Sequence, residues 1–134
     1  MTNRTYHRFL RCMTRVSYFG PIYYILLYIA YMYQKEQISE TEMITAREVA
    51  SASLCRVAIR HGVALEWLDS LLNNALIEYN TPEKLYNEVK RYVDIVSDNH
   101  SFVNDYSLDI DEVLINFFES LITSYNGDWE GEEF

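Results

Sequence analysis

The chain has 134 residues, of which 49% are hydrophobic, 15% aromatic and 23% charged. This composition supplies enough apolar surface for one hydrophobic core and argues against disorder, and the length favours a single domain, residues 1–134. The 4 glycines and 2 prolines are too few for an all-β domain of many short strands, and a net charge of −9 repels nucleic acid. We therefore expect an all-α domain with no nucleic-acid partner.

Residues 3–15 have the pattern of an amphipathic helix with a basic face. Four arginines recur at helical spacing: Arg4, Arg8, Arg11 and Arg15. The opposite face is apolar and consists of Tyr6, Phe9, Leu10 and Met13. Residues 1–33 contain no acid, whereas the rest of the chain holds all 20 acidic residues. This N-terminal face is suited to contact with an anionic lipid or an acidic partner.

Residues 16–33 form an uncharged run that is as long as a short membrane span. Six of these residues are tyrosine, and the Gly20-Pro21 pair leaves only about a dozen apolar residues behind it. We therefore predict a buried helix over residues 21–36, with Pro21 in its first turn. A membrane anchor and a signal peptide stay open as alternatives.

The next helical pattern starts at a cap, either Ser39 or Thr41, and continues to Leu72. It includes a run of small residues over 46–53 that would let a neighbouring helix approach closely. Gly62 is expected to break or kink this pattern.

Two further helices follow. Thr81-Pro82 predicts the start of a helix that runs to about Ser97, and its apolar stripe is Leu85, Val89, Tyr92, Val93 and Val96. Asp109 or Asp111 is expected to start the last helix, Val113 to Tyr125, which Asn126-Gly127 stops. An acidic tail, residues 126–134, ends the chain.

No motif in the sequence asks for an enzymatic explanation. The three histidines are scattered, and Cys12 and Cys55 are typical of reduced thiols rather than of a disulfide or zinc site. The acids around Asp109 and Asp111, together with Asp105, lack the glycine and ligand spacing of a calcium loop. We therefore predict no catalytic residue, no metal and no cofactor.

Two segments resemble the Bcl-2 family of helical apoptosis regulators, in particular the divergent members of large DNA viruses. Residues 28–31, Tyr-Ile-Ala-Tyr, followed by Gln34-Lys35, look like the first-helix motif of that family. Residues 54–65 are similar to its homology-3 helix, in which four apolar positions flank a Gly-Asp pair. Gly62 fits this pattern, whereas Val63 replaces the aspartate, and the Asn-Trp-Gly-Arg motif of the family is absent.

The resemblance implies a bundle of about six to seven helices around a central apolar helix, with a hydrophobic groove on its surface. It implies a non-enzymatic inhibitor of apoptosis that sequesters the amphipathic helix of a pro-apoptotic protein. The residues expected to line the groove are Leu54, Val57, Leu65, Leu68, Leu85, Val89, Tyr92 and Val93. The alternative for each of these residues is a place in the internal core.

The expected location is intracellular, in the host cytoplasm or at the mitochondrial surface, and a homodimer is a further expected partner. Two other functions stay open at this point. One is a helical structural or assembly subunit of a larger viral complex, suggested by a tyrosine-rich helix that is large for one small core. The other is a small membrane-anchored protein that uses residues 16–33.

Overall fold

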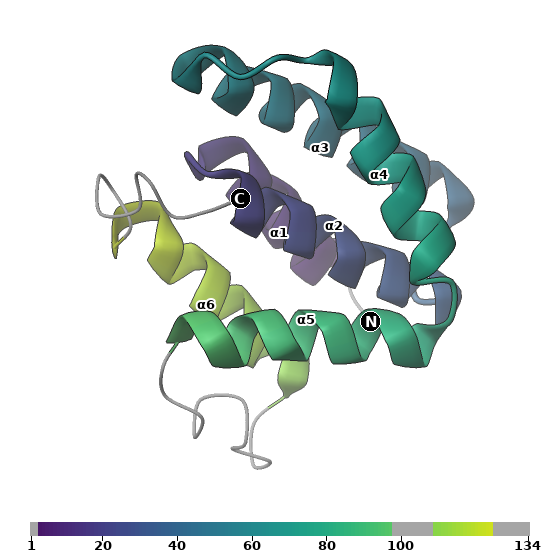
Figure 1. The fold of residues 1–134 in the computed structure, drawn as a ribbon. Helices are drawn as coiled ribbons and strands as arrows, with labels where there is room; N and C mark the ends of the chain where they lie inside the picture. Colours follow the sequence, from purple (N-terminus) through teal and green to yellow (C-terminus); the bar gives the residue numbers. More distant parts are fainter. Residues whose placement is uncertain (1–2, 98–108, 125–134) are drawn as a thin grey trace.

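The computed structural model describes residues 3–97 and 109–124, and these form six α-helices and no strand (Figure 1). The helices are α1 (Asn3–Arg15), α2 (Phe19–Gln34), α3 (Glu40–His61), α4 (Glu66–Glu78), α5 (Pro82–Ser97) and α6 (Ile110–Ser124). The prediction of an all-α bundle is confirmed. The expected acidic tail, the end of the last helix at Tyr125 and the position of Asp105 lie outside the described residues.

Helix α2 is the centre of the bundle and contacts each of the other five helices. It carries no charged residue, and the six residues from Ile25 to Ala30 are all buried in turn. A helix that is apolar on every side is stable when other helices surround it. The prediction of a buried helix from residue 21 is therefore confirmed, with the start at Phe19 and Pro21 in the first turn.

Within the described part of the chain, no helix combines the length and the apolar character that crossing a membrane requires.

The long pattern from residue 39 to residue 72 divides into two helices. Ser39 caps α3: its hydroxyl accepts the N–H of Glu42 at 3.1 Å, and the Glu42 carboxylate accepts the N–H of Ser39 at 2.8 Å. Gly62 ends α3 in the left-handed conformation, with φ 71°. The expected break at Gly62 is thus a complete turn, after which α4 begins at Glu66 in a new direction.

Side-chain caps also start the last two helices as the sequence indicates. The Thr81 hydroxyl accepts the N–H of Lys84 at 3.2 Å, one turn into α5. The Asp109 carboxylate accepts the N–H of Asp111 at 3.0 Å, and α6 begins at Ile110.

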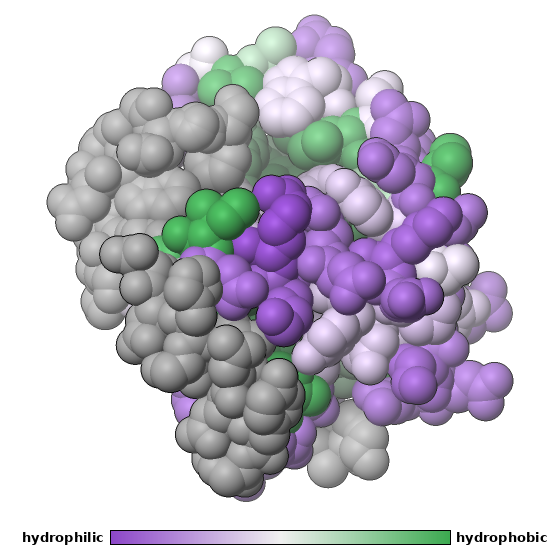
Figure 2. Space-filling model, turned by 60° about the horizontal axis from the view of Figure 1, so that its bottom comes forward, coloured by the Kyte–Doolittle hydropathy of each residue, from purple (hydrophilic) through white to green (hydrophobic). Residues whose placement is uncertain are grey.

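The helices surround α2 unevenly. Helices α1, α3, α5 and α6 pack closely, and Phe9 of α1 lies between Tyr28 of α2 and Phe118 of α6, with ring centroids 5.4 and 6.4 Å away. Helix α4 packs mainly on α3 and α2, and Figure 1 shows that it diverges from α5 with distance from the loop that joins them. On the side seen in Figure 2, hydrophilic side chains cover most of the described surface, and hydrophobic residues appear only in small separate spots.

Candidate functional site

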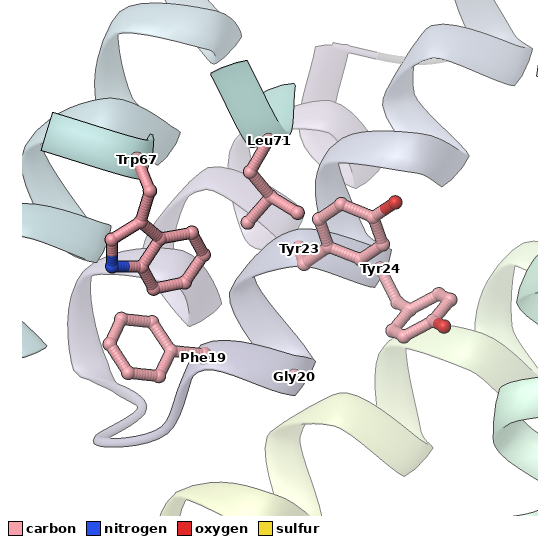
Figure 3. Close-up of a pocket in the computed structure, with 6 residues that line it drawn as sticks. All are labelled: Phe19, Gly20, Tyr23, Tyr24, Trp67 and Leu71. Atoms are coloured by element: carbon pink, nitrogen blue, oxygen red, sulfur yellow. The ribbon is translucent and has the colours of Figure 1, made fainter. Parts of the chain in front are cut away.

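An apolar cavity lies between α2 and α4, near the start of both helices (Figure 3). Its volume is about 260 Å³. Trp67 and Leu71, one turn apart on α4, face Phe19 and Tyr23 on α2, and the Trp67 and Phe19 ring centroids are 5.8 Å apart. The complete lining contains no charged residue and consists of Phe19, Gly20, Tyr23, Tyr24, Trp67 and Leu71. We call these six residues the α4–α5 groove. Its floor is α2, one wall is α4, and α5 borders the far edge, where Tyr92 contacts Tyr24.

Tyr24 connects the groove to α5. Its ring stacks on that of Tyr92 at 4.0 Å, and its hydroxyl donates to a Glu88 carboxylate oxygen at 2.9 Å. Arg91 lies at the same edge, with a guanidinium nitrogen 3.4 Å from the Tyr24 hydroxyl. Glu88 and Arg91 also form an ion pair, so each charge at this edge of the groove is balanced locally.

The groove floor is electrically neutral at physiological pH. Burial, together with the nearby Tyr79 and Glu88, raises the pKa of Tyr23 to about 12. Burial and the hydrogen bond to Glu88 also raise the pKa of Tyr24. Burial raises the pKa of Glu88 as well, but the hydrogen bonds from Arg91 and Tyr24 outweigh it and lower the pKa overall. The two tyrosines therefore keep their protons while Glu88 is ionised.

A second cavity lies on the other side of α4, where α4 approaches α3 and the end of α2. It has a volume of about 280 Å³, and its lining includes Met43, Ile44 and Leu76. The charged residues Glu40 and Arg47 also line it. Its wall is thus less suited to a purely apolar side chain than the α4–α5 groove.

The structure places seven of the eight residues predicted to line a groove inside the core. These buried residues are Leu54, Val57, Leu68, Leu85, Val89, Tyr92 and Val93. Leu65 differs: it precedes α4 and is 43% exposed. Tyr92 comes closest to the groove but is covered by Tyr24. The predicted residues on α4 and α5 therefore pack these helices against α2, and the groove is lined by neighbours of Leu68 on α4 and by residues of α2.

The sequence interpretation missed all six lining residues. One signal was present: Trp67 and Leu71 are four residues apart on a helix whose buried stripe is Leu68, Leu72 and Ala75. A second apolar stripe beside the buried one is typical of a helix with two contact surfaces.

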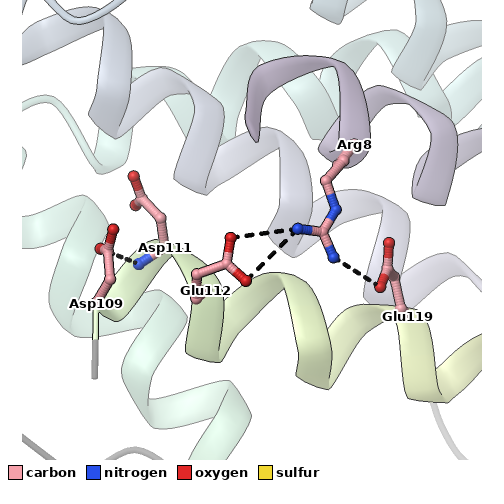
Figure 4. A network of polar contacts seen from close by, with 5 residues as sticks. All are labelled: Arg8, Asp109, Asp111, Glu112 and Glu119. Carbon is pink, nitrogen blue, oxygen red and sulfur yellow. Dashed lines mark hydrogen bonds and ion pairs between the residues drawn. The ribbon is translucent and has the colours of Figure 1, made fainter. Parts of the chain in front are cut away.

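A network of polar contacts joins α6 to α1 and α2, away from the α4–α5 groove (Figure 4). The Arg8 guanidinium on α1 pairs with Glu112 at 3.2 Å and with Glu119 at 3.1 Å. Tyr28 of α2 donates its hydroxyl to the half-buried Asp111 carboxylate. The acids at the start of α6 therefore serve contacts between helices, and Asp109 is a helix cap, as the sequence favoured over a calcium loop.

Both cysteines and His61 lie in the part of the chain that the structure describes. Cys12 is buried and Cys55 half-buried, and neither forms a disulfide. His61, six residues after Cys55, contacts the Ser17 carbonyl at 3.3 Å and stacks near Tyr18. Among the residues that the structure describes, no three His, Cys, Asp or Glu side chains gather as metal ligands would.

No protein-family model matches the chain, and no curated protein and no solved structure matches it either. The relationship to the Bcl-2 family therefore stays a prediction that depends on the sequence segments.

Proposed function

We propose that this chain is a non-enzymatic protein-interaction domain that binds the amphipathic helix of a partner in the α4–α5 groove. Following the sequence resemblance, the proposed partner is a pro-apoptotic protein, and the proposed outcome is inhibition of apoptosis by sequestration. The observation that carries the proposal is the cavity between Trp67 and Tyr23, which is lined only by uncharged residues.

The size of the cavity sets the chemistry of the ligand. A volume of about 260 Å³ admits one large aliphatic or aromatic side chain. Removing such a side chain from water contributes about 1.5–3 kcal/mol, which is a substantial part of the affinity of a short helix. The rest of the ligand helix would lie along α4 toward the Arg91 edge, placing further apolar residues at i+3 and i+7 on the aromatic floor.

The composition of the groove supports binding rather than catalysis. Tyrosine and tryptophan give large contact areas at a small cost in conformational entropy, and both residue types are enriched in protein interfaces. Trp67 is 38% exposed, although it is among the largest side chains in the molecule. The alternative proposal is an assembly subunit, motivated by the size of the tyrosine-rich helix. The five helices that contact α2 bury residues 25–30 but leave Phe19, Tyr23 and Tyr24 half-buried.

The proposal is tested by calorimetric titration of the full chain with a panel of synthetic pro-apoptotic helices. We expect at least one peptide to bind with sub-micromolar affinity. Trp67→Ala and Leu71→Glu should each weaken that binding about tenfold or more, because both remove the apolar wall. Ile77→Ala is the matched control: Ile77 lies on the same helix, is 70% exposed and is not part of the groove.

Circular dichroism of each variant verifies that the helices are intact. If no peptide of the panel produced heat, the apoptotic role would be wrong. If a peptide bound but Trp67→Ala left its affinity unchanged, the partner would bind elsewhere on the molecule.

A further inference from the structure

The C-terminal ends of α1 and α3 lie side by side and together form a basic surface. The Arg56 guanidinium of α3 donates to the carbonyl oxygens of Met13 and Val16, each at 3.2 Å. Arg60, one turn later, lies 3.5 Å from the Ser17 hydroxyl in the loop after α1. These contacts fix two arginines of α3 beside the end of α1, which carries exposed arginines of its own.

We define the basic end of the bundle as Arg11, Arg15, Arg56 and Arg60. All four side chains are exposed, and none forms an ion pair with any residue that the structure describes. The charges are close enough to act on one another: burial and the charge of Arg60 together lower the pKa of Arg56. The cluster is therefore uncompensated positive charge in a chain of net charge −9.

The surroundings of the basic end keep acids at a distance. Residues 1–35 and 49–65 contain no aspartate or glutamate. The acids that face α1 from α6, Glu112 and Glu119, are held by Arg8. The acids that bound the second acid-free segment are Glu48 and Glu66. We therefore expect a positive electrostatic potential at this end. At distances shorter than the Debye length, salt screens it only in part.

Exposed aliphatic side chains lie next to these arginines. Ile59, between Arg56 and Arg60 in sequence, is 70% exposed, and Leu65 in the following loop is 43% exposed. The phosphate backbone of a nucleic acid gains nothing from contact with aliphatic groups, and the net negative charge of the chain repels it. None of the described cavities is lined by these residues. A membrane that contains anionic lipids matches both the positive charge and the exposed aliphatic side chains, because its headgroups are negative and its interior is apolar.

We infer that the basic end is a docking surface for a membrane of anionic phospholipids, with Arg11, Arg15, Arg56 and Arg60 on the headgroup phosphates and Ile59 in the interface. The basic end and the α4–α5 groove have no residue in common. This inference is independent of the proposed helix binding, because none of the groove residues takes part in it.

The experiment is co-sedimentation of the full chain with phosphatidylcholine vesicles, with and without phosphatidylserine. We expect binding to the phosphatidylserine vesicles only, and weaker binding as salt is added. The double variant Arg56→Glu/Arg60→Glu should lower the partition coefficient about tenfold or more. Because Arg56 also caps α1, a second pair, Arg11→Glu/Arg15→Glu, should give a similar loss without removing a described side-chain hydrogen bond.

Matched controls distinguish an effect of the basic end from a general effect of net charge. Lys35→Glu/Lys84→Glu makes the same charge change away from the basic end, because Lys35 follows the end of α2 and Lys84 lies in the first turn of α5. We expect this pair to change binding by less than about twofold. Ile59→Ser should weaken binding several-fold, whereas Ile77→Ser, at an isoleucine with the same 70% exposure, should not.

Three results would overturn the inference. The first is equal binding to neutral and anionic vesicles, and the second is an equal loss in the lysine control pair. The third is retention by an acidic peptide or a DNA duplex at salt concentrations that release the vesicles, since this would assign the surface to a different class of partner.

Discussion

The two halves of α2 have different surroundings, although both are equally free of charge. In the half that begins at Ile25, consecutive residues are buried because α1, α3, α5 and α6 surround the helix. In the first half, Phe19, Tyr23 and Tyr24 are only half-buried, because α4 diverges from α5 and leaves a groove. We call these the closed half and the open half of the bundle. The comparison indicates that apolar residues on one helix are either enclosed in the core or left at an open surface, depending on how closely its neighbours converge.

The largest expected difference concerns aromatic residues of the two halves. Phe9→Ala in the closed half should lower the free energy of unfolding by about 3–5 kcal/mol, because the ring is fully buried between Tyr28 and Phe118. Trp67→Ala in the open half should cost less, about 1.5–3 kcal/mol, because this residue is already 38% exposed in the native state. Urea denaturation measures both. Equal losses would mean that the groove is part of the core.

The next largest effect concerns the hydrogen bond from the Tyr28 hydroxyl of α2 to the Asp111 carboxylate of α6, in the closed half. Tyr28→Phe leaves the half-buried Asp111 carboxylate without its donor, and we expect a loss of about 1–3 kcal/mol in the free energy of unfolding. Tyr23→Phe in the open half is the control and should have a smaller effect, because no described hydrogen bond of its hydroxyl is lost. A loss in the control as large as that in Tyr28→Phe would contradict the assignment.

The same contact predicts a dependence on pH. Burial raises the pKa of Asp111 above its ordinary value of 3.8; the Tyr28 hydrogen bond opposes this, and Asp109 and Glu112 add to it. The folded state therefore holds this proton more tightly than the unfolded state, so the contribution of Asp111 to stability decreases as the pH rises from about 3.8 through the raised value. Asp111→Asn keeps an oxygen acceptor for Tyr28 and removes the titration. Its stability relative to wild type should therefore increase over that range in urea denaturation series, and a constant difference would be evidence against this origin.

The smallest expected effect lies in the turn between α3, which packs on the closed half, and α4, which borders the open half. Gly62 ends α3 with a positive φ of 71°, and an added Cβ would meet no atom within 4 Å. Gly62→Ala should thus cost only the backbone strain of the left-handed conformation, about 1–2 kcal/mol. Gly62→Asn should cost less, since asparagine adopts this conformation more readily. Thermal unfolding of both variants tests the order, and a larger loss in Gly62→Asn would show that space rather than φ limits the position.

Much of the fold was predictable because its signals are local. The apolar stripe of residues 85–96, the caps at Ser39 and Thr81, and the break at Gly62 depend on neighbours within one or two turns, and all of them have the expected role. The uncharged run after Gly20 also predicts its own burial, because an apolar helix too short to span a membrane needs other helices around it.

The groove was not predictable in the same way, because its lining depends on how α4 packs against α2. Periodicity identified the buried stripes of both helices, including Leu68, Leu72, Leu85 and Val89, but it could not indicate which residues beside those stripes stay exposed. The stacking of Tyr24 on Tyr92 covers a residue that the sequence placed at the surface of the groove. Such a contact joins positions 68 residues apart in the chain and has no local signal.

The unequal burial of the two cysteines provides a chemical measure of folding. Cys12 is 1% exposed, and burial raises the pKa of its thiol to about 12, whereas Cys55 is half-buried on α3. An alkylating reagent will therefore modify Cys55 first in the native molecule and will reach Cys12 only when α1 separates from the bundle. The mass of the labelled chain then distinguishes native from opened molecules one by one, with no need for an optical probe.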